Sequence, residues 1–100
     1  MKREQIEVLI KENRQFLTNE YNVSKIGLFG SYVRNEQTET SDVDILVEFS
    51  KPLGFKFFGL QNYLESLFNK PVDLITVKGL KPYFKEGILR EVHYQWNETI

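Results

Sequence analysis

The chain has 100 residues, of which 41% are apolar and 14% aromatic, enough to build the core of one domain with little room for a second. The net charge of −1 argues against a protein that binds nucleic acid through bulk positive charge. The absence of cysteine excludes disulfides and cysteine-ligated zinc, as suits a reducing cytoplasm. No apolar run reaches membrane-spanning length, and the charged N-terminus is unlike a signal peptide. We therefore expect one soluble, cytoplasmic domain over residues 1–100.

Hydrophobic spacing and turn residues predict seven elements, in the order helix, strand, short helix, strand, helix, strand, helix. Their predicted ranges are 3–20, 25–29, 31 to 34 or 35, 42–49, 57–68, 71–77 and 82 to about 94. Asn13 interrupts the apolar face of the first helix, and Gly87 weakens the middle of the last. This order predicts an α+β domain with one small sheet covered by helices.

The strand over 42–49 has two unlike faces, because successive side chains of a strand point to opposite sides. One face is wholly apolar and consists of Val43, Ile45, Val47 and Phe49. The other face begins with two carboxylates, Asp42 and Asp44, and continues with Leu46 and Glu48. This alternation fixes the register and places both aspartates at the N-terminal end of one face.

A third carboxylate, Asp73, lies in the later strand PVDLITV. If the two strands are neighbours, Asp73 can face Asp42 and Asp44. Two unit charges 4 Å apart at an effective dielectric near 20 repel by about 4 kcal/mol. Three neighbouring carboxylates therefore destabilise the fold, and their presence indicates a role in function. Mg²⁺ prefers such hard oxygen ligands together with substrate phosphates, and two ions can flank a displacement at phosphorus. An isolated D-x-D is a weak signal of a metal site, because most such pairs are solvated surface acids, and the third acid strengthens the metal interpretation.

The stretch LFGSYVR, just upstream, passes from a strand into a tight turn. Gly30 permits a close approach or an unusual φ, and Ser31 offers a hydroxyl and a backbone N–H at a helix start. Arg34 lies on the same side of that turn and is able to bind a phosphate through two parallel hydrogen bonds. The alternative is a strand-to-helix turn without a binding function, with a serine cap and a surface arginine. No Walker P-loop motif is present.

Taken in order, these motifs resemble the minimal nucleotidyltransferase family of the DNA polymerase β-like superfamily. The similarity lies in Gly30-Ser31, a spacer of about ten residues, SDVDILVEF with its D-x-D, and VDLITV as the strand of the third carboxylate. LKPYFKEGILREVHY resembles the terminal helix of the family, including its Leu-Arg-Glu turn, so that the similarity extends from Ile26 to Tyr94. The family usually has glycine after the arginine, where this chain has Asn35, a residue that tolerates the left-handed region.

The resemblance implies a polymerase β palm-like fold, with a small mixed three-stranded sheet covered by helices. It implies transfer of a nucleoside monophosphate from ATP to a hydroxyl, with two Mg²⁺ ions as cofactors. Asp42, Asp44 and Asp73 would bind the metal, with Asp73 as third ligand or base. The residues expected at the triphosphate are Gly30, Ser31, Arg34 and Ser41.

Small stand-alone members of this family are typically antitoxins that adenylylate a tyrosine of a HEPN-domain toxin. The resemblance therefore implies that partner, while the chain itself is too short to carry an acceptor domain. The alternative is a non-catalytic binding module that neutralises its partner by contact alone. A metal-dependent nuclease is a weaker alternative because no E-x-K motif follows Asp73 at a suitable spacing. Homo- or hetero-oligomers remain open.

Other residues carry less information about function. We expect His93, the single histidine, to be a surface residue of the last helix. The remaining aromatic residues of interest are expected in the core, with an exposed patch for a partner as the alternative. They are Phe55, Phe57, Phe58, Tyr94 and Trp96.

Overall fold

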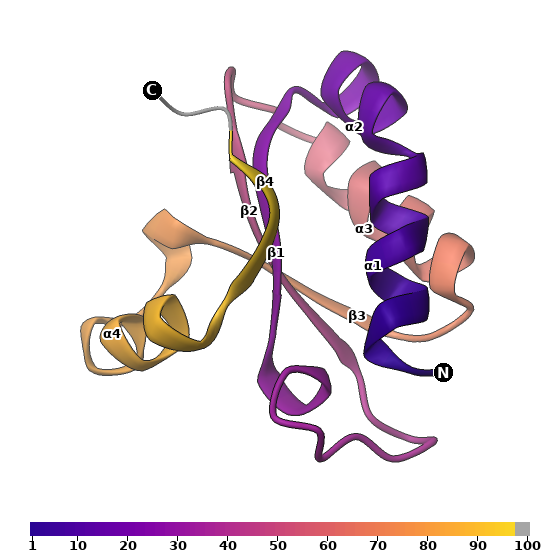
Figure 1. Ribbon diagram of the computed structural model, residues 1–100. Coiled ribbons are helices and arrows are strands. Elements are labelled where there is room, and N and C mark those ends of the chain that lie inside the picture. Colours follow the sequence, from indigo (N-terminus) through magenta and orange to yellow (C-terminus); the bar gives the residue numbers. More distant parts are fainter. Residues whose placement is uncertain (98–100) are drawn as a thin grey trace.

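The computed structural model describes residues 1–97, which form a four-stranded sheet with helices on both sides (Figure 1). The helices are α1 (Arg3–Glu12), α2 (Arg14–Tyr21), α3 (Lys56–Phe68) and α4 (Pro82–Glu91), with short 3₁₀ turns η1 (Gly30–Tyr32) and η2 (Val77–Gly79). The strands are β1 (Val23–Phe29), β2 (Val43–Phe49), β3 (Val72–Thr76) and β4 (His93–Asn97). The predicted α+β class is confirmed, and the bounds predicted for β2, α3 and β3 agree with the structure to within a residue.

The sheet is mixed, as predicted, and its strands lie in the order β3-β2-β1-β4. β1 runs antiparallel to both β2 and β4, whereas β2 and β3 are parallel. The prediction of three strands is wrong, because residues 93–97 form a fourth strand and the last helix ends at Glu91. The helix stops where Val92 adopts an extended conformation, with φ −62° and ψ 134°.

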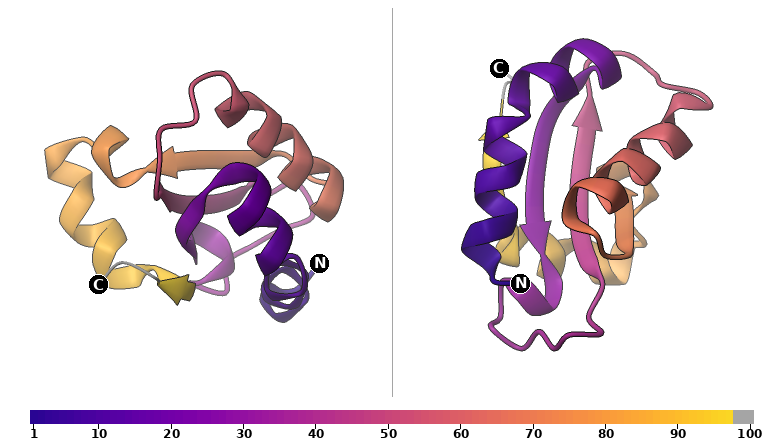
Figure 2. Two further views of the ribbon diagram at one scale, coloured as in Figure 1. Left: turned by 90° about the horizontal axis from the view of Figure 1, so that it is seen from above. Right: turned by 90° about the vertical axis from the view of Figure 1, so that its right-hand side faces the viewer.

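The core lies between one face of the sheet and helices α1, α2 and α3 (Figure 2). β2 presents three fully buried side chains to this core, Val43, Ile45 and Val47, so its predicted apolar face is confirmed. Helix α4 lies on the other side of the sheet and has no buried residue. The opposite face of the sheet, which carries the aspartates, is therefore only partly covered.

The first predicted helix is broken at Asn13 into α1 and α2. The Asn13 amide nitrogen donates to the Leu9 carbonyl at 2.7 Å, and its amide oxygen accepts a hydrogen bond from the Tyr63 hydroxyl at 2.7 Å. A side chain that bonds nearby backbone competes with the helix ladder. The polar residue that interrupts the apolar face thus ends α1 and ties α2 to α3.

The aromatic residues divide between the two expectations. Trp96 is buried, with 6% of its surface exposed, and Phe57 and Tyr94 are half-buried. Phe55 and Phe58 are 91% and 63% exposed, so their prediction as core residues is wrong. They belong to the turn before α3 and to its outer face, where no other element covers them.

His93 is exposed as expected, although it begins β4 and does not belong to a helix. Within residues 1–97, every helix is too short or too polar to cross a lipid bilayer.

The fourth strand makes a testable contribution to stability. Trp96→Ala removes a buried ring that faces Ile26 of β1 across the sheet, and we expect the free energy of unfolding to fall by about 3–5 kcal/mol. Phe84→Ala, in α4, removes a ring that is 55% exposed and should change it by less than about 0.5 kcal/mol. Denaturant unfolding of both variants provides the measurement. Equal small losses would mean that residues 93–97 do not pack on the core.

Candidate active site

Two of the three predicted carboxylates face each other across the parallel pair β2–β3. Asp44 and Asp73 are register partners, and the residues beside them, Val43 with Val72 and Ile45 with Leu74, pair on the core side. Because paired residues of adjacent strands share a face, both carboxylates lie on the face opposite the core. Asp42 is exposed directly before β2, at the same end of the sheet.

The charges of these carboxylates act on one another. The pKa of Asp44 is raised from 3.8 to about 6, first by burial and then by the negative charges of Asp73 and Asp42. Arg34 acts in the opposite direction, while Glu91 raises the pKa slightly further. A concentration of negative charge that disfavours ionisation is the environment in which a divalent cation gains most.

The oxygen donors are of the kind that Mg²⁺ prefers, but they do not yet converge on one point. Among residues 1–97, no three histidine, cysteine, aspartate or glutamate side chains are gathered closely enough to hold a metal ion. Asp42 and Asp73 are both exposed, so their side chains are free to rotate. A cation shared by the three carboxylates would therefore need Asp42 and Asp73 to adopt other rotamers.

Gly30 forms the turn beside Asp44 and meets two separate requirements. Its φ of 77° lies in the left-handed region, where L side chains are strained. A Cβ atom at this position would also lie 2.0 Å from Asp44 Oδ2 and 2.8 Å from Asp44 Cγ. Any other residue here would therefore strain the backbone and displace the carboxylate of Asp44.

The rest of the turn is held by backbone bonds and by Asn35. The Gly30 carbonyl accepts hydrogen bonds from the N–H groups of Val33 and Arg34, each at 3.1 Å. The Ser31 carbonyl accepts one from the Glu36 N–H at 2.9 Å. Asn35 has a φ of 59°, the left-handed conformation that its family counterpart, glycine, would adopt without strain. The replacement of glycine by asparagine therefore leaves the backbone of the turn intact.

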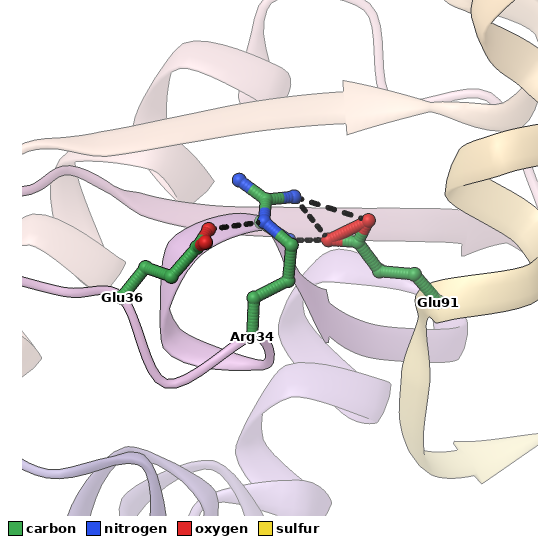
Figure 3. Close-up of polar contacts among 4 residues, drawn as sticks. Arg34, Glu36 and Glu91 are labelled. Atoms are coloured by element: carbon green, nitrogen blue, oxygen red, sulfur yellow. Dashed lines mark hydrogen bonds and ion pairs between the residues drawn. The ribbon is translucent and has the colours of Figure 1, made fainter.

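Arg34 lies at this turn and is already paired with two carboxylates (Figure 3). Its Nε donates to Glu36 Oε1 at 2.7 Å, and its Nη1 donates to Glu91 Oε1 and Oε2 at 2.7 and 3.2 Å. The pKa of Arg34 is raised by its hydrogen bond to Glu36 and by the charge of Glu91. A phosphate at Arg34 thus meets a guanidinium whose donors are partly engaged.

Ser41 lies on the loop before β2, where its hydroxyl accepts a hydrogen bond from the Thr38 N–H at 2.8 Å. Its own N–H donates to the Thr38 carbonyl at 3.1 Å. These contacts close the loop over residues 38–41 and leave Ser41 a local role in the structure.

Glu91 is the residue of this region that the sequence interpretation did not single out. Its Oε1 accepts hydrogen bonds both from Arg34 and from the backbone N–H of Gly30, the latter at 2.7 Å. The only sequence signal was the Leu-Arg-Glu turn in the resemblance of the last helix. Spacing could not reveal a contact between residues 61 positions apart.

A hollow of about 420 Å³ lies away from these residues, at the C-terminal ends of β2 and β3. Its walls come from residues 47–52 and 76–78. Asp42, Asp44 and Asp73 lie at the opposite ends of the same strands, so the hollow and the carboxylates are separate features. Because carboxylates are the groups able to bind a metal ion, we place the candidate site at the N-terminal ends of β2 and β3.

Comparisons with known proteins agree on one family. A family model described as the nucleotidyltransferase domain matches residues 7–94. The protein adenylyltransferase MntA of Thermococcus cleftensis is 45% identical over 92 residues, which cover 91% of this chain and 93% of that relative.

Solved structures give the same fold. A candidate minimal nucleotidyltransferase superposes with a TM-score of 0.77 at 31% identity, covering 93% of this chain and 95% of the other. A structure of a tri-AMPylated HEPN toxin of Shewanella oneidensis in complex with MNT antitoxin matches with a TM-score of 0.64 at 21% identity. The latter match covers 91% of this chain and 72% of that chain, and it shows likeness of fold alone.

The contact of position 30 with the Asp44 side chain, together with the positive φ, predicts a requirement for glycine there. Gly30→Ala should destabilise the protein by more than about 1 kcal/mol, because it combines a positive φ with a contact that forces Asp44 to rotate. Gly54→Ala is the matched control, since Gly54 has a φ of 59° but no atom within 4 Å of the added Cβ. Thermal unfolding should show the larger loss at Gly30. Equal losses would leave strain alone as the cause.

The raised pKa of Asp44 predicts a pH-dependent gain from its removal. Between about pH 4 and 6 the unfolded chain releases this proton before the folded chain does, so wild-type stability falls as the pH rises through that window. Asp44→Asn does not ionise and should be more stable than wild type above pH 6. The shift corresponds to about 3 kcal/mol, and we expect about 1–2 kcal/mol because the carboxyl is partly solvated.

Denaturant unfolding from pH 4 to pH 8 measures this gain, which should shrink towards pH 4. Glu48→Gln is the control on the same face of β2, where Glu48 pairs with Lys25 at 3.4 Å. This control should not be more stable than wild type at any pH. A gain for Asp44→Asn that stays constant with pH would contradict the raised pKa.

Proposed function

The chain belongs to the nucleotidyltransferase domain family, and on this premise we propose that it is a protein adenylyltransferase that acts as the antitoxin of a HEPN-domain toxin. We propose further that residues 1–100 act as one domain in the cytoplasm. The observation that carries the proposal is the pairing of Asp44 with Asp73 beside the Gly30 turn. The carboxylates and the turn that we propose to bind phosphate meet there at one end of the sheet.

In the proposed reaction, a hydroxyl oxygen of the acceptor attacks the α-phosphorus of ATP. A new bond joins that oxygen to phosphorus, the bond from phosphorus to the β-phosphate oxygen breaks, and pyrophosphate leaves with its electron pair. The hydroxyl proton is lost, and Asp73 would accept it if it acts as the base and not as the third metal ligand. A tyrosine hydroxyl has a pKa near 10, so such help is needed at neutral pH.

The roles of the other residues follow from their positions. Gly30 and Ser31 would bind the β- and γ-phosphates through backbone N–H groups and the serine hydroxyl, with Arg34 stabilising charge that develops there. Asp42, Asp44 and Asp73 would hold two Mg²⁺ ions. These ions would neutralise the triphosphate and lower the pKa of the attacking hydroxyl. Ser41 would contribute by fixing the loop that leads to Asp42.

The acceptor is proposed from relatives. The Thermococcus relative is named a protein adenylyltransferase, and the Shewanella structure contains a HEPN toxin that carries AMP groups together with MNT antitoxin. We infer that this chain likewise modifies a tyrosine of its own HEPN toxin. Neutralisation by contact alone is the second candidate, favoured by the exposed rings of Tyr83 and Phe84 on α4.

The test is co-expression of the chain with its toxin, followed by mass spectrometry of the toxin. Wild type should add AMP to a tyrosine, and Asp42→Ala/Asp44→Ala should abolish the addition while the two proteins still associate. Glu48→Gln, on the same strand, is the matched control and should leave the modification unchanged.

Two outcomes would contradict the proposal. If the double variant neutralises the toxin as well as wild type does, contact is sufficient. If the toxin gains no mass with wild type, the acceptor is wrong.

A further inference from the structure

The Glu91 carboxylate lies where the turn offers its donors to an anion (Figure 3). Glu91 Oε1 is 2.7 Å from the Gly30 nitrogen and 2.7 Å from Arg34 Nη1, and Oε2 is 3.2 Å from the same Arg34 atom. One backbone N–H and one guanidinium thus converge on a single anionic group. Phosphate oxygens are bound by the same combination of donors.

The negative charge of Glu91 does not stabilise helix α4. Glu91 is the last residue of α4, at the helix end where a negative charge is unfavourable. Helix α4 also has no buried residue. The Glu91 carboxylate therefore stabilises the turn, and its position at the helix end is explained by the donors that it meets there.

Two glutamates share the guanidinium of Arg34. Glu36 takes the Nε of the guanidinium, and Glu91 takes Nη1. Both are negative and both pair with Arg34, but Glu91 alone also accepts from the Gly30 N–H. The two glutamates differ in this one contact, which makes Glu36 a natural control for Glu91.

We propose that Glu91 is a further residue of the nucleotide site, an internal anion that occupies the phosphate-binding turn and is displaced when a polyphosphate binds. The inference rests on the proposed function, because it takes the Gly30 turn to be the phosphate site. While the site is free of nucleotide, Glu91 satisfies the Gly30 N–H and holds Arg34 in place. Binding then requires exchange of one carboxylate for phosphate oxygens on the same donors.

The exchange needs only a local movement. Residue 93 is already paired with Leu28 of β1, so the backbone just beyond Glu91 is fixed to the sheet. The Glu91 side chain is about one-quarter exposed and has solvent on one side into which it can rotate. Side-chain rotation is fast compared with a domain movement, and the competition therefore lowers the affinity by the fraction of time for which the donors are free.

The experiment measures binding of inorganic tripolyphosphate in the presence of Mg²⁺ by isothermal titration calorimetry. Glu91→Gln keeps the shape of the side chain and removes its charge, and we expect it to bind about tenfold more tightly than wild type. Glu91→Ala should also bind more tightly. Glu36→Gln removes the same charge from Arg34 but leaves the Gly30 contact, and should gain clearly less. Glu86→Gln, exposed on α4 and paired with Arg90, should bind as wild type does.

Melting of the ligand-free proteins supplies a second measurement. Glu91→Gln should melt below wild type because the turn loses a charged acceptor, so affinity and stability should change in opposite directions. Equal or weaker binding by Glu91→Gln and Glu91→Ala, with wild type binding normally, would overturn the inference and leave the phosphate site standing. A gain in Glu36→Gln as large as in Glu91→Gln would overturn it too, by showing a general charge effect. Failure of every protein to bind would overturn the phosphate site itself.

Discussion

Burial of one face of β2 is the constraint on which the site depends. Val43, Ile45 and Val47 are fully buried, and each alternates with a residue of the opposite face. A shift of one residue would bury Asp44 and expose Ile45, at a cost far beyond that of any single surface contact. The hydrophobic core therefore fixes the position of the carboxylates, although none of them contributes to that core.

The same constraint extends to both neighbours of β2. On one side Asp44 is opposite Asp73 of β3, and on the other it is opposite Phe29, one residue before Gly30. The backbone register thus brings acids and turn together without any attraction between them. Burial and then the charges of Asp73 and Asp42 raise the pKa of Asp44 and so oppose its ionisation, and Arg34 offsets this only in part. The fold accepts a local cost at the edge where chemistry is proposed, which is common at functional sites.

The parts of this structure that were predictable from sequence are those set by local patterns. The alternation in β2, the turn at Gly30 and the left-handed Asn35 all follow from the properties of neighbouring residues. The fourth strand does not, because His93–Asn97 becomes a strand only by pairing with β1, about 70 residues earlier. The bond from Tyr63 to Asn13 is likewise a contact between distant residues, although the break at Asn13 itself has a local cause. Glu91 was missed for the same reason, since its partners are distant along the chain.

The pairing of the last strand with the first has a consequence for how the protein is made. β1 is an interior strand of the sheet only when β4 is in place, and β4 contains the last residues that the structure describes. During synthesis, β1 and β2 emerge long before their partner, and one edge of β1 then presents unpaired backbone groups to other chains. The growing polypeptide is exposed to association at that edge until residues 93–97 leave the ribosome. Glu91 arrives at nearly the same moment, so the turn at Gly30 receives its carboxylate partner as the edge of the sheet is covered.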